Sequence, residues 1–90
     1  MDAPELLKNE VRSLLTTNLL LQVAEQDIGD ELPLFGPGGL GLDSVDALQI
    51  VVALDKTYGV KISDANAARG ILQNVSTIAA EIARHRAGAA

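Results

Sequence analysis

Ser44 is the residue of this chain best placed to carry an attached chemical group. It follows the glycine-rich residues 36–41 and begins an aliphatic run that predicts a helix over 43–58. The first turn of a helix favours an attached phosphate through its free N–H groups and its dipole. No base adjoins Ser44 in the sequence, so it is not expected to be a self-activated nucleophile. The simpler interpretation, which chemistry alone favours, is that Asp43 or Ser44 only caps the helix, with Asp46 completing a box-like pair.

Other motifs of the chain do not support nucleotide or metal chemistry. Gly36, Gly38 and Gly41 match a dinucleotide fingerprint, but no strand or βαβ unit surrounds them. There is no cysteine to join His85, the single histidine, which we expect to be solvated near the end of the last helix. The acids of the loop do not follow the calcium-loop pattern; they are Glu25, Asp27, Asp30 and Glu31. We therefore predict no metal site.

Hydrolase chemistry is also not expected. His85 lies far from any loop serine in sequence, so no Ser-His-Asp arrangement is predicted. A hydrolase further needs a pocket, and a cavity of roughly 300 Å³ is hard to fit beside so small a core. The chain is therefore predicted not to be a hydrolase.

Two elements must position Ser44: a first helix and a long loop. The spacing of Leu7, Val11, Leu14 and Leu15 predicts a helix over 3–21, with Asp2 as its cap. The loop over 22–42 is too long to be structureless in a compact domain. Its apolar residues are expected to pin it across one end of the core; they are Leu32, Leu34, Phe35, Leu40 and Leu42.

The helix over 43–58 has two apolar stripes. The first is predicted to face the core and comprises Ala47, Ile50, Val51, Leu54 and Tyr58. The wet face is predicted to comprise Asp46, Gln49, Ala53 and Lys56. Val45, Leu48 and Val52 form the second stripe, which either widens the buried face or docks a partner. Gly59 is expected to end this helix.

The remaining residues complete an all-α fold. Val60-Lys61-Ile62 is predicted to be an extended connector with Val60 and Ile62 inward. Ser63 or Asp64 caps a short helix over 65–69, ended by Gly70, and Asn74 caps a last helix over 75–86. The apolar face of that last helix is Val75, Ile78, Ala79 and Ile82. We predict a four-helix bundle with a long first loop and a short third helix, in a single domain of residues 1–86 with a flexible tail over 87–90.

Composition narrows the possible partners. The chain has 90 residues, 48% of them hydrophobic, a net charge of −5 and only two aromatic residues, Phe35 and Tyr58. Acidic domains without stacking platforms are unsuited to nucleic acid. Residues 25–64 hold eight acids against two bases, which is typical of a solvated surface or of a site that attracts basic partners. No run is apolar enough to span a bilayer and no secretory signal is evident, so we expect a soluble cytoplasmic monomer without membrane insertion.

Gly41-Leu42-Asp43-Ser44-Val45-Asp46-Ala47-Leu48 resembles the attachment motif of acyl carrier proteins. The resemblance continues through the first helix, the long loop, the aliphatic second helix ending in Tyr58, and two later segments. These segments are Val60-Lys61-Ile62-Ser63-Asp64 and Asn74-Val75-x-Thr77-Ile78. It therefore covers nearly the whole chain, in order and at the spacing of the family.

The resemblance implies a role for each residue of the motif. Ser44 would carry 4′-phosphopantetheine, installed by a phosphopantetheinyl transferase from coenzyme A, and the thiol of that arm would hold acyl groups as thioesters. Asp43 would help position the transferase chemistry. The acyl-transferring and synthase enzymes served by the carrier would dock on the second helix, through Leu42, Val45, Asp46, Leu48, Val52 and Asp55.

Two departures from the family pattern bear on the pathway. Gln49 and Lys56 stand where housekeeping fatty-acid carriers commonly have acids, and residues 36–41 are unusually rich in glycine. Both indicate a specialised pathway rather than bulk fatty-acid synthesis, so the enzymes served would belong to a fatty-acid, polyketide or related specialised pathway. One alternative is a peptidyl or aminoacyl carrier, although its motif more often has Gly-Gly or Gly-His before the serine, where this chain has Leu42-Asp43. The other alternative is an unmodified helical adaptor, which a permanently unmodified Ser44 would favour.

Overall fold

Four helices form the protein in the computed structural model, which describes residues 5–19, 27–35 and 38–88. They are α1 (Glu5–Leu19), α2 (Ser44–Tyr58), α3 (Ala65–Ile71) and α4 (Val75–Gly88). The predicted all-α bundle with a long first loop and a short third helix is confirmed. The predicted cap at Asp2 lies outside the described residues.

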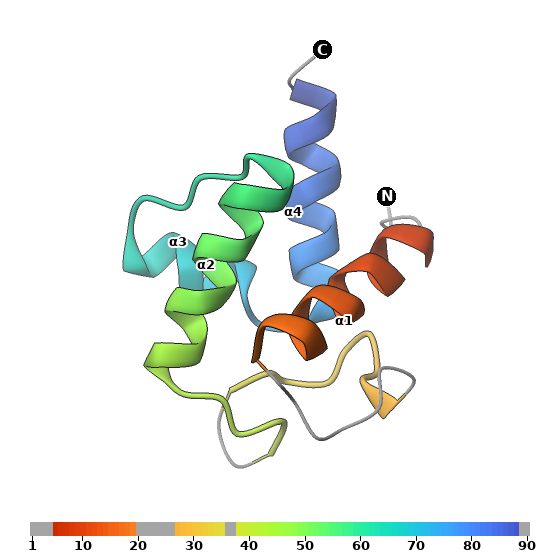
Figure 1. Ribbon diagram of the computed structural model, residues 1–90, viewed down its shortest axis with the longest axis vertical. Coiled ribbons are helices and arrows are strands. Elements are labelled where there is room, and N and C mark those ends of the chain that lie inside the picture. The colour runs from red at the N-terminus through yellow and green to blue at the C-terminus, as the bar shows by residue number, and fades with distance from the viewer. Residues whose placement is uncertain (1–4, 20–26, 36–37, 89–90) are drawn as a thin grey trace.

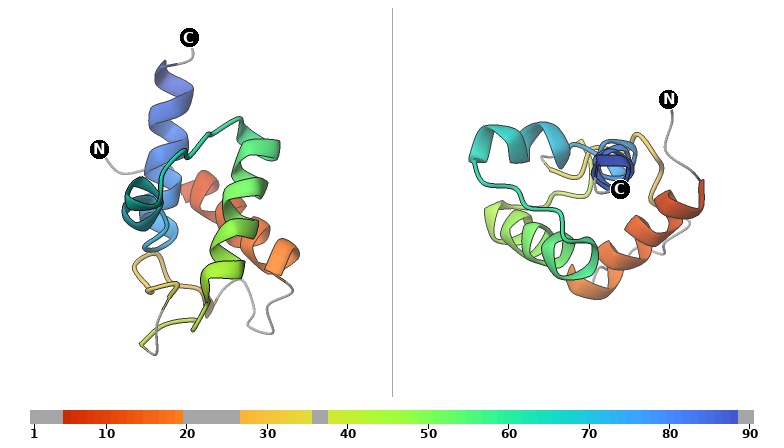
Figure 2. Two further views of the ribbon diagram at one scale, coloured as in Figure 1. Left: turned by 90° about the vertical axis from the view of Figure 1, so that its left-hand side faces the viewer. Right: turned by 90° about the horizontal axis from the view of Figure 1, so that it is seen from above.

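The helices pack around α4. Helix α1 lies against both α4 and α2, and α3 lies against α4 (Figure 1). Seen from above, α4 is end-on, with α1 on one side of it and α3 on the other (Figure 2). The described parts of the first loop run beneath the bundle, at the end where α2 begins (Figure 1). Ser44 therefore lies at the loop end of the molecule.

The core is made by the predicted faces of the outer helices. Each of the residues predicted to face inward from α1 and α4 is buried: Leu7, Val11, Leu14, Leu15, Val75, Ile78, Ala79 and Ile82. Val60 of the connector is buried as predicted, and Ile62 is partly buried against the same core. The helical periods of the sequence therefore identified these faces correctly.

Helix α2 differs from the prediction in how its inner face is divided. Ile50 and Leu54 are fully buried, but Ala53, predicted to be wet, is only 5% exposed. Ala53 lies three residues after Ile50 and therefore shares its face of the helix. Ala47 and Val51 are only partly buried. The buried face of α2 is thus rotated slightly toward Ala53.

The residue at which a helix ends depends on hydrogen bonding and packing, and a glycine in the sequence does not always mark it. Gly70 was predicted to end the third helix, but α3 continues to Ile71, and the Leu72 amide donates to the Ala68 carbonyl at 2.8 Å. Leu72 is buried, so packing of this residue in the core favours the continuation of α3 by two residues beyond its predicted end. Helix α4 runs to Gly88, two residues beyond its predicted end. Gly59 caps α2 as predicted.

Candidate functional site

The start of α2 is held by a reciprocal pair of side chains. The Asp43 Oδ1 atom accepts hydrogen bonds from the amides of Val45 at 3.0 Å and Asp46 at 3.2 Å. In return, the Asp46 carboxylate accepts the Asp43 amide at 3.0 Å. This is a capping box, which fixes where the helix begins. Ser44 is consequently the first helical residue, as its position in the motif requires.

Ser44 is exposed at this junction. No side-chain hydrogen bond joins its hydroxyl to another described residue, so the oxygen is accessible from solvent. The expectation that free helix amides would hold a phosphate here is wrong for two of them, because Asp43 already occupies the amides of Val45 and Asp46. A phosphate on Ser44 would therefore not have these two amides as free donors.

Two glycines shape the loop just before Ser44. A Cβ atom on Gly39 would lie 1.8 Å from the Pro33 carbonyl oxygen, so only glycine fits there. That carbonyl accepts the Leu40 amide at 3.1 Å. Gly41 has a φ of 73°, in the left-handed region that glycine adopts without strain. The glycine-rich sequence is therefore needed for a tight turn that leads the chain into α2.

The loop is also anchored to α1. The Lys8 ammonium pairs with the Asp30 carboxylate at 3.1 Å, and the Arg12 guanidinium contacts the same carboxylate. Arg12 further donates to the Ile28 carbonyl at 2.7 Å. These contacts hold the loop against the first helix.

Backbone hydrogen bonds join the same loop to the start of α4. The Leu34 amide donates to the Gln73 carbonyl at 3.0 Å, and the Ser76 amide donates to the Asp30 carbonyl at 3.0 Å. Leu34 is fully buried, and Phe35 and Leu40 are partly buried against the core. The prediction that apolar residues pin the loop across one end of the core is confirmed for Leu34, Phe35, Leu40 and Leu42, whereas Leu32 is not among the residues packed against the core.

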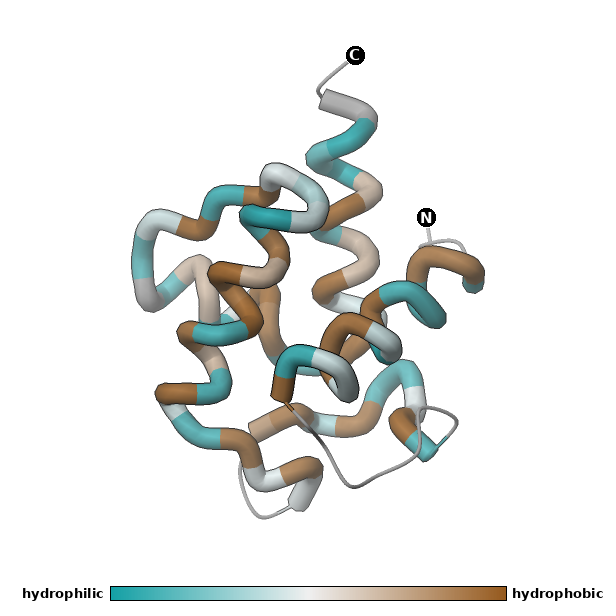
Figure 3. Tube along the Cα trace, in the orientation of Figure 1, coloured by the Kyte–Doolittle hydropathy of each residue, from teal (hydrophilic) through white to brown (hydrophobic). Residues whose placement is uncertain are grey.

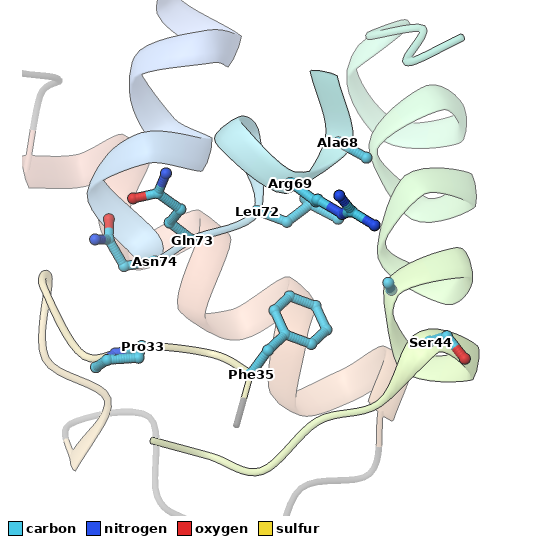
Figure 4. Close-up of a pocket in the computed structure, with 9 residues that line it drawn as sticks. Pro33, Phe35, Ser44, Ala68, Arg69, Leu72, Gln73 and Asn74 are labelled. Carbon is cyan, nitrogen blue, oxygen red and sulfur yellow. The ribbon is translucent and has the colours of Figure 1, made fainter. Parts of the chain in front are cut away.

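A pocket of about 650 Å³ lies beside Ser44. It is bounded by the loop, α2, α3 and the connection to α4, and its lining residues are Pro33, Phe35, Ser44, Ala47, Ala68, Arg69, Leu72, Gln73 and Asn74 (Figure 4). The expectation that a chain of this size leaves no room for such a cavity is wrong. The physical reason is that the pocket opens at the surface beside the core, because α3 packs on α4 more closely than on α2.

The second apolar stripe of α2 is exposed. Val45, Leu48 and Val52 have 62%, 64% and 44% of their surface accessible. Their exposure excludes the alternative that this stripe widens the buried face. Apolar positions recur along the whole length of α2 (Figure 3). Apolar side chains spaced in this way on one helix face are typical of a contact surface.

The other residues predicted to contact partners differ in accessibility. Leu42 is only 9% exposed and its side chain belongs to the core. Asp46 is half-buried in the capping box. Asp55 is exposed and pairs with the Lys61 ammonium at 3.0 Å. In this conformation Leu42 therefore supports the site from inside, whereas Asp55 can meet a partner directly.

Among the described residues, no side-chain hydrogen bond links the Ser44 hydroxyl to a group that could act as its general base. His85 is exposed and lies near Gly59, at the opposite end of α2. A helix of 15 residues is about 22 Å long, so this imidazole is far from Ser44. Within the described ranges, no group of three or more His, Cys, Asp and Glu side chains is arranged to hold a metal ion. The described residues therefore place neither this histidine nor a metal-binding cluster at Ser44.

Several pocket residues were missed by reasoning from the sequence. Phe35 was assigned only to pinning the loop, and Arg69 was assigned no role. Arg69 is the single Lys or Arg between Lys61 and Arg84, which is the one sequence signal that marks it. Leu72 carried no signal, because its burial follows from the turn that extends α3.

Comparison with known proteins agrees with this arrangement. The family described as a phosphopantetheine attachment site matches residues 9–82, which include Ser44, the loop, α2 and α3 in full, and most of α1 and α4. An acyl carrier protein of Onion yellows phytoplasma (strain OY-M) is 33% identical over 69 residues, which cover 77% of this chain and 79% of that protein. The chain belongs to the acyl carrier protein family. A second acyl carrier protein, from Aster yellows witches'-broom phytoplasma (strain AYWB), is 49% identical over 39 residues, covering 43% of this chain and 45% of that protein.

Membership of the family establishes the class of the protein and its cofactor. The chain is a carrier and not an enzyme, and its cofactor is covalently bound 4′-phosphopantetheine. The described residues fit this group, because an accessible serine hydroxyl adjoins an open pocket. When bound, the cofactor supplies a thiol that holds an acyl group as a thioester. No helix in the described part of the carrier has the length and apolarity needed to cross a membrane.

Proposed function

We propose that this carrier holds acyl groups as thioesters on a 4′-phosphopantetheine arm attached to Ser44, and shuttles them between enzymes of a specialised pathway. The single observation that carries the proposal is the position of Ser44. It is the first residue of α2, exposed, and next to a pocket of about 650 Å³. A fixed helix start gives a transferase a rigid target, and the pocket gives the attached chain a place to lie.

The partners in this proposal dock on the outer side of α2. Val45, Leu48 and Val52 offer an exposed apolar stripe that begins directly beside Ser44. Asp43 and Asp55 flank the stripe with carboxylates that attract basic partners. A transferase bound here would reach the Ser44 hydroxyl and supply the base that the carrier lacks.

The capping role of Asp43 refines its proposed part in the transfer. Its Oδ1 atom accepts two amides of the first turn. Exchange of Asp43 for alanine would therefore loosen the helix start, at a cost of about 1 kcal/mol, as well as remove a carboxylate from the transferase contact. We propose both duties for Asp43, positioning Ser44 in the free carrier and binding the transferase in the complex.

Loading in vitro tests the attachment site. The purified chain is incubated with coenzyme A, magnesium and a broad-specificity phosphopantetheinyl transferase, and its intact mass is measured. We expect the addition of one phosphopantetheine to the natural chain and of none to a Ser44→Ala variant.

The other serines of the described residues serve as internal controls. Ser13 and Ser63 are exposed, and Ser76 is partly buried, but none of the three begins a helix beside the pocket. Fragment masses locate the modified residue. Modification of any of these three serines in place of Ser44 would overturn the proposal.

A further inference from the structure

One positive charge is the only formal charge among the residues that line the pocket. Of the nine residues that line it, Arg69 alone carries a formal charge, and no aspartate or glutamate is among them. The lining also includes the ring of Phe35 and the methyl group of Ala47. In Figure 4 the Arg69 guanidinium extends from α3 toward α2, across the space that Phe35 faces from below. The pocket therefore combines apolar residues and three uncharged polar ones with one cation, the exposed Arg69.

The ion pairs of the carrier leave Arg69 without a partner among the described residues. The chain has seven Lys and Arg residues. Five of them pair with carboxylates; they are Lys8, Arg12, Lys61, Arg84 and Arg86. Lys56 and Arg69 form no ion pair within the described ranges. Of these two, only Arg69 lines the pocket. A guanidinium that has no ion pair with a described residue therefore lies beside the space that an attached chain would occupy.

We propose that the acyl group held in this pocket bears a carboxylate, which pairs with Arg69. The proposal rests on the proposed function, because the pocket can hold an acyl chain only if Ser44 carries the arm. A carboxylate that enters an apolar pocket loses hydration, which is costly unless a cation and hydrogen-bond donors replace the water. Arg69 supplies that cation and presents paired N–H donors in the planar geometry that matches a carboxylate. Phe35, Ala47 and Leu72 meanwhile contact the methylene part of the chain.

The same guanidinium could instead meet the phosphodiester on Ser44, which is the other anion near the pocket. The two sources are distinguished by when the contact forms. A phosphodiester contact is present as soon as the arm is attached, whereas a cargo contact forms only when the acyl group ends in a carboxylate.

The experiment compares two cargoes of equal length. The carrier is loaded from octanoyl-coenzyme A, which gives a methyl end, and from suberoyl-coenzyme A, which gives a carboxylate end. Pantetheinylated carrier without an acyl group is the third sample. Intact mass verifies each loading, and fragment masses verify that Ser44 is the residue modified. The midpoint of thermal unfolding and the NMR signal of the Arg69 Nε–H group are then measured for each form.

We expect the suberoyl form to unfold about 3 °C or more above the octanoyl form, as befits one charge-assisted contact in a domain of this size. The Arg69 signal should move in the suberoyl form alone. The Arg69→Gln variant should lose the difference between the two cargoes. Lys56→Gln is the matched control, because it removes an exposed, unpaired cation outside the pocket and should keep the difference.

Three results would overturn the proposal. An octanoyl form as stable as the suberoyl form would show that the carboxylate gains nothing in the pocket. Movement of the Arg69 signal on attachment of the arm, with no further change on acylation, would assign the guanidinium to the phosphodiester. Failure of Ser44 to load at all would remove the proposed function as well, whereas normal loading without discrimination between cargoes would remove only the role of Arg69. If Arg69→Gln lowers the stability of the unloaded carrier, the NMR signal of the Arg69 Nε–H group in the natural chain still shows whether the carboxylate contacts Arg69.

Discussion

Helix α2 presents two apolar faces, one buried against the core and the other exposed. Ile50, Ala53 and Leu54 are buried against the core, whereas Val45, Leu48 and Val52 are exposed. Both sets recur at helical spacing and both are aliphatic, so hydropathy alone does not distinguish them (Figure 3). The two faces differ because α1 packs on one side of α2 and leaves the other side uncovered. An apolar stripe left open at the edge of the site is available to another protein.

The largest expected effect is on the buried face. Leu54→Ala should lower the free energy of unfolding by about 2–5 kcal/mol, because it removes core methyl groups and leaves a cavity. Val52→Ala, two residues earlier on the exposed stripe, should cost less than about 0.5 kcal/mol. Urea unfolding of the two variants measures both values. Equal losses would show that the two faces are not distinct.

A charge on the exposed stripe should affect loading rather than stability. Leu48→Glu should change the free energy of unfolding by less than about 1 kcal/mol, as at other surface positions. The same variant should slow pantetheinylation of Ser44 about tenfold or more, because it places a charge in an apolar contact.

Gln49→Glu is the matched control for Leu48→Glu. It adds the same charge at the next residue, which is exposed but outside the apolar stripe. A rate near that of the natural chain is expected for this control. Equal slowing of both variants would mean that charge, and not apolar contact, governs docking, and a loss of several kcal/mol for Leu48→Glu would mean that Leu48 is buried.

The smallest expected effect lies at the far end of the buried face. Tyr58 donates a hydrogen bond to the Glu10 carboxylate at 2.8 Å, and Arg86 lies 5.2 Å from the centre of its ring. Burial, together with the Glu10 contact, raises the pKa of Tyr58 from 10.0 to about 12. Because the folded pKa lies above the unfolded one, the stabilisation is fully present below pH 10 and is lost as the pH rises through 12.

A Tyr58→Phe variant isolates that contribution. At neutral pH it should be less stable than the natural chain by about 1 kcal/mol, the usual value of one hydrogen bond. The difference in unfolding free energy between the two proteins should shrink as the pH passes from about 10 to about 12. A difference that stays constant over this range would exclude Tyr58 as its source.

Sequence patterns predicted most of the fold because the core faces are periodic. The inward residues of α1 and α4, the capping residues Asp64 and Asn74, and the stop at Gly59 follow from local chemistry that the chain itself displays. Ala53 was misassigned because the pattern does not reveal on which side a neighbouring helix packs. Gly70 was misassigned because burial of Leu72 outweighs the local preference of glycine.

The site was predicted only in its local part. The capping residues around Ser44 lie within one turn of each other, so their interaction can be read from spacing. The pocket could not be predicted, because Phe35, Ala47 and Arg69 come from three separate elements whose distances depend on tertiary packing. The structure also decides between the two capping candidates, because it is the Asp43 carboxylate that accepts the Val45 and Asp46 amides.

The intact mass of the carrier purified from its own cells tests the central claim most directly. The account predicts that the natural chain bears one phosphopantetheine, partly as an acyl thioester that hydroxylamine releases, and that a Ser44→Ala chain expressed in the same cells bears neither. The mass of the released group also identifies the cargo. A natural chain that is wholly unmodified, or a modification that persists in Ser44→Ala, would contradict the account.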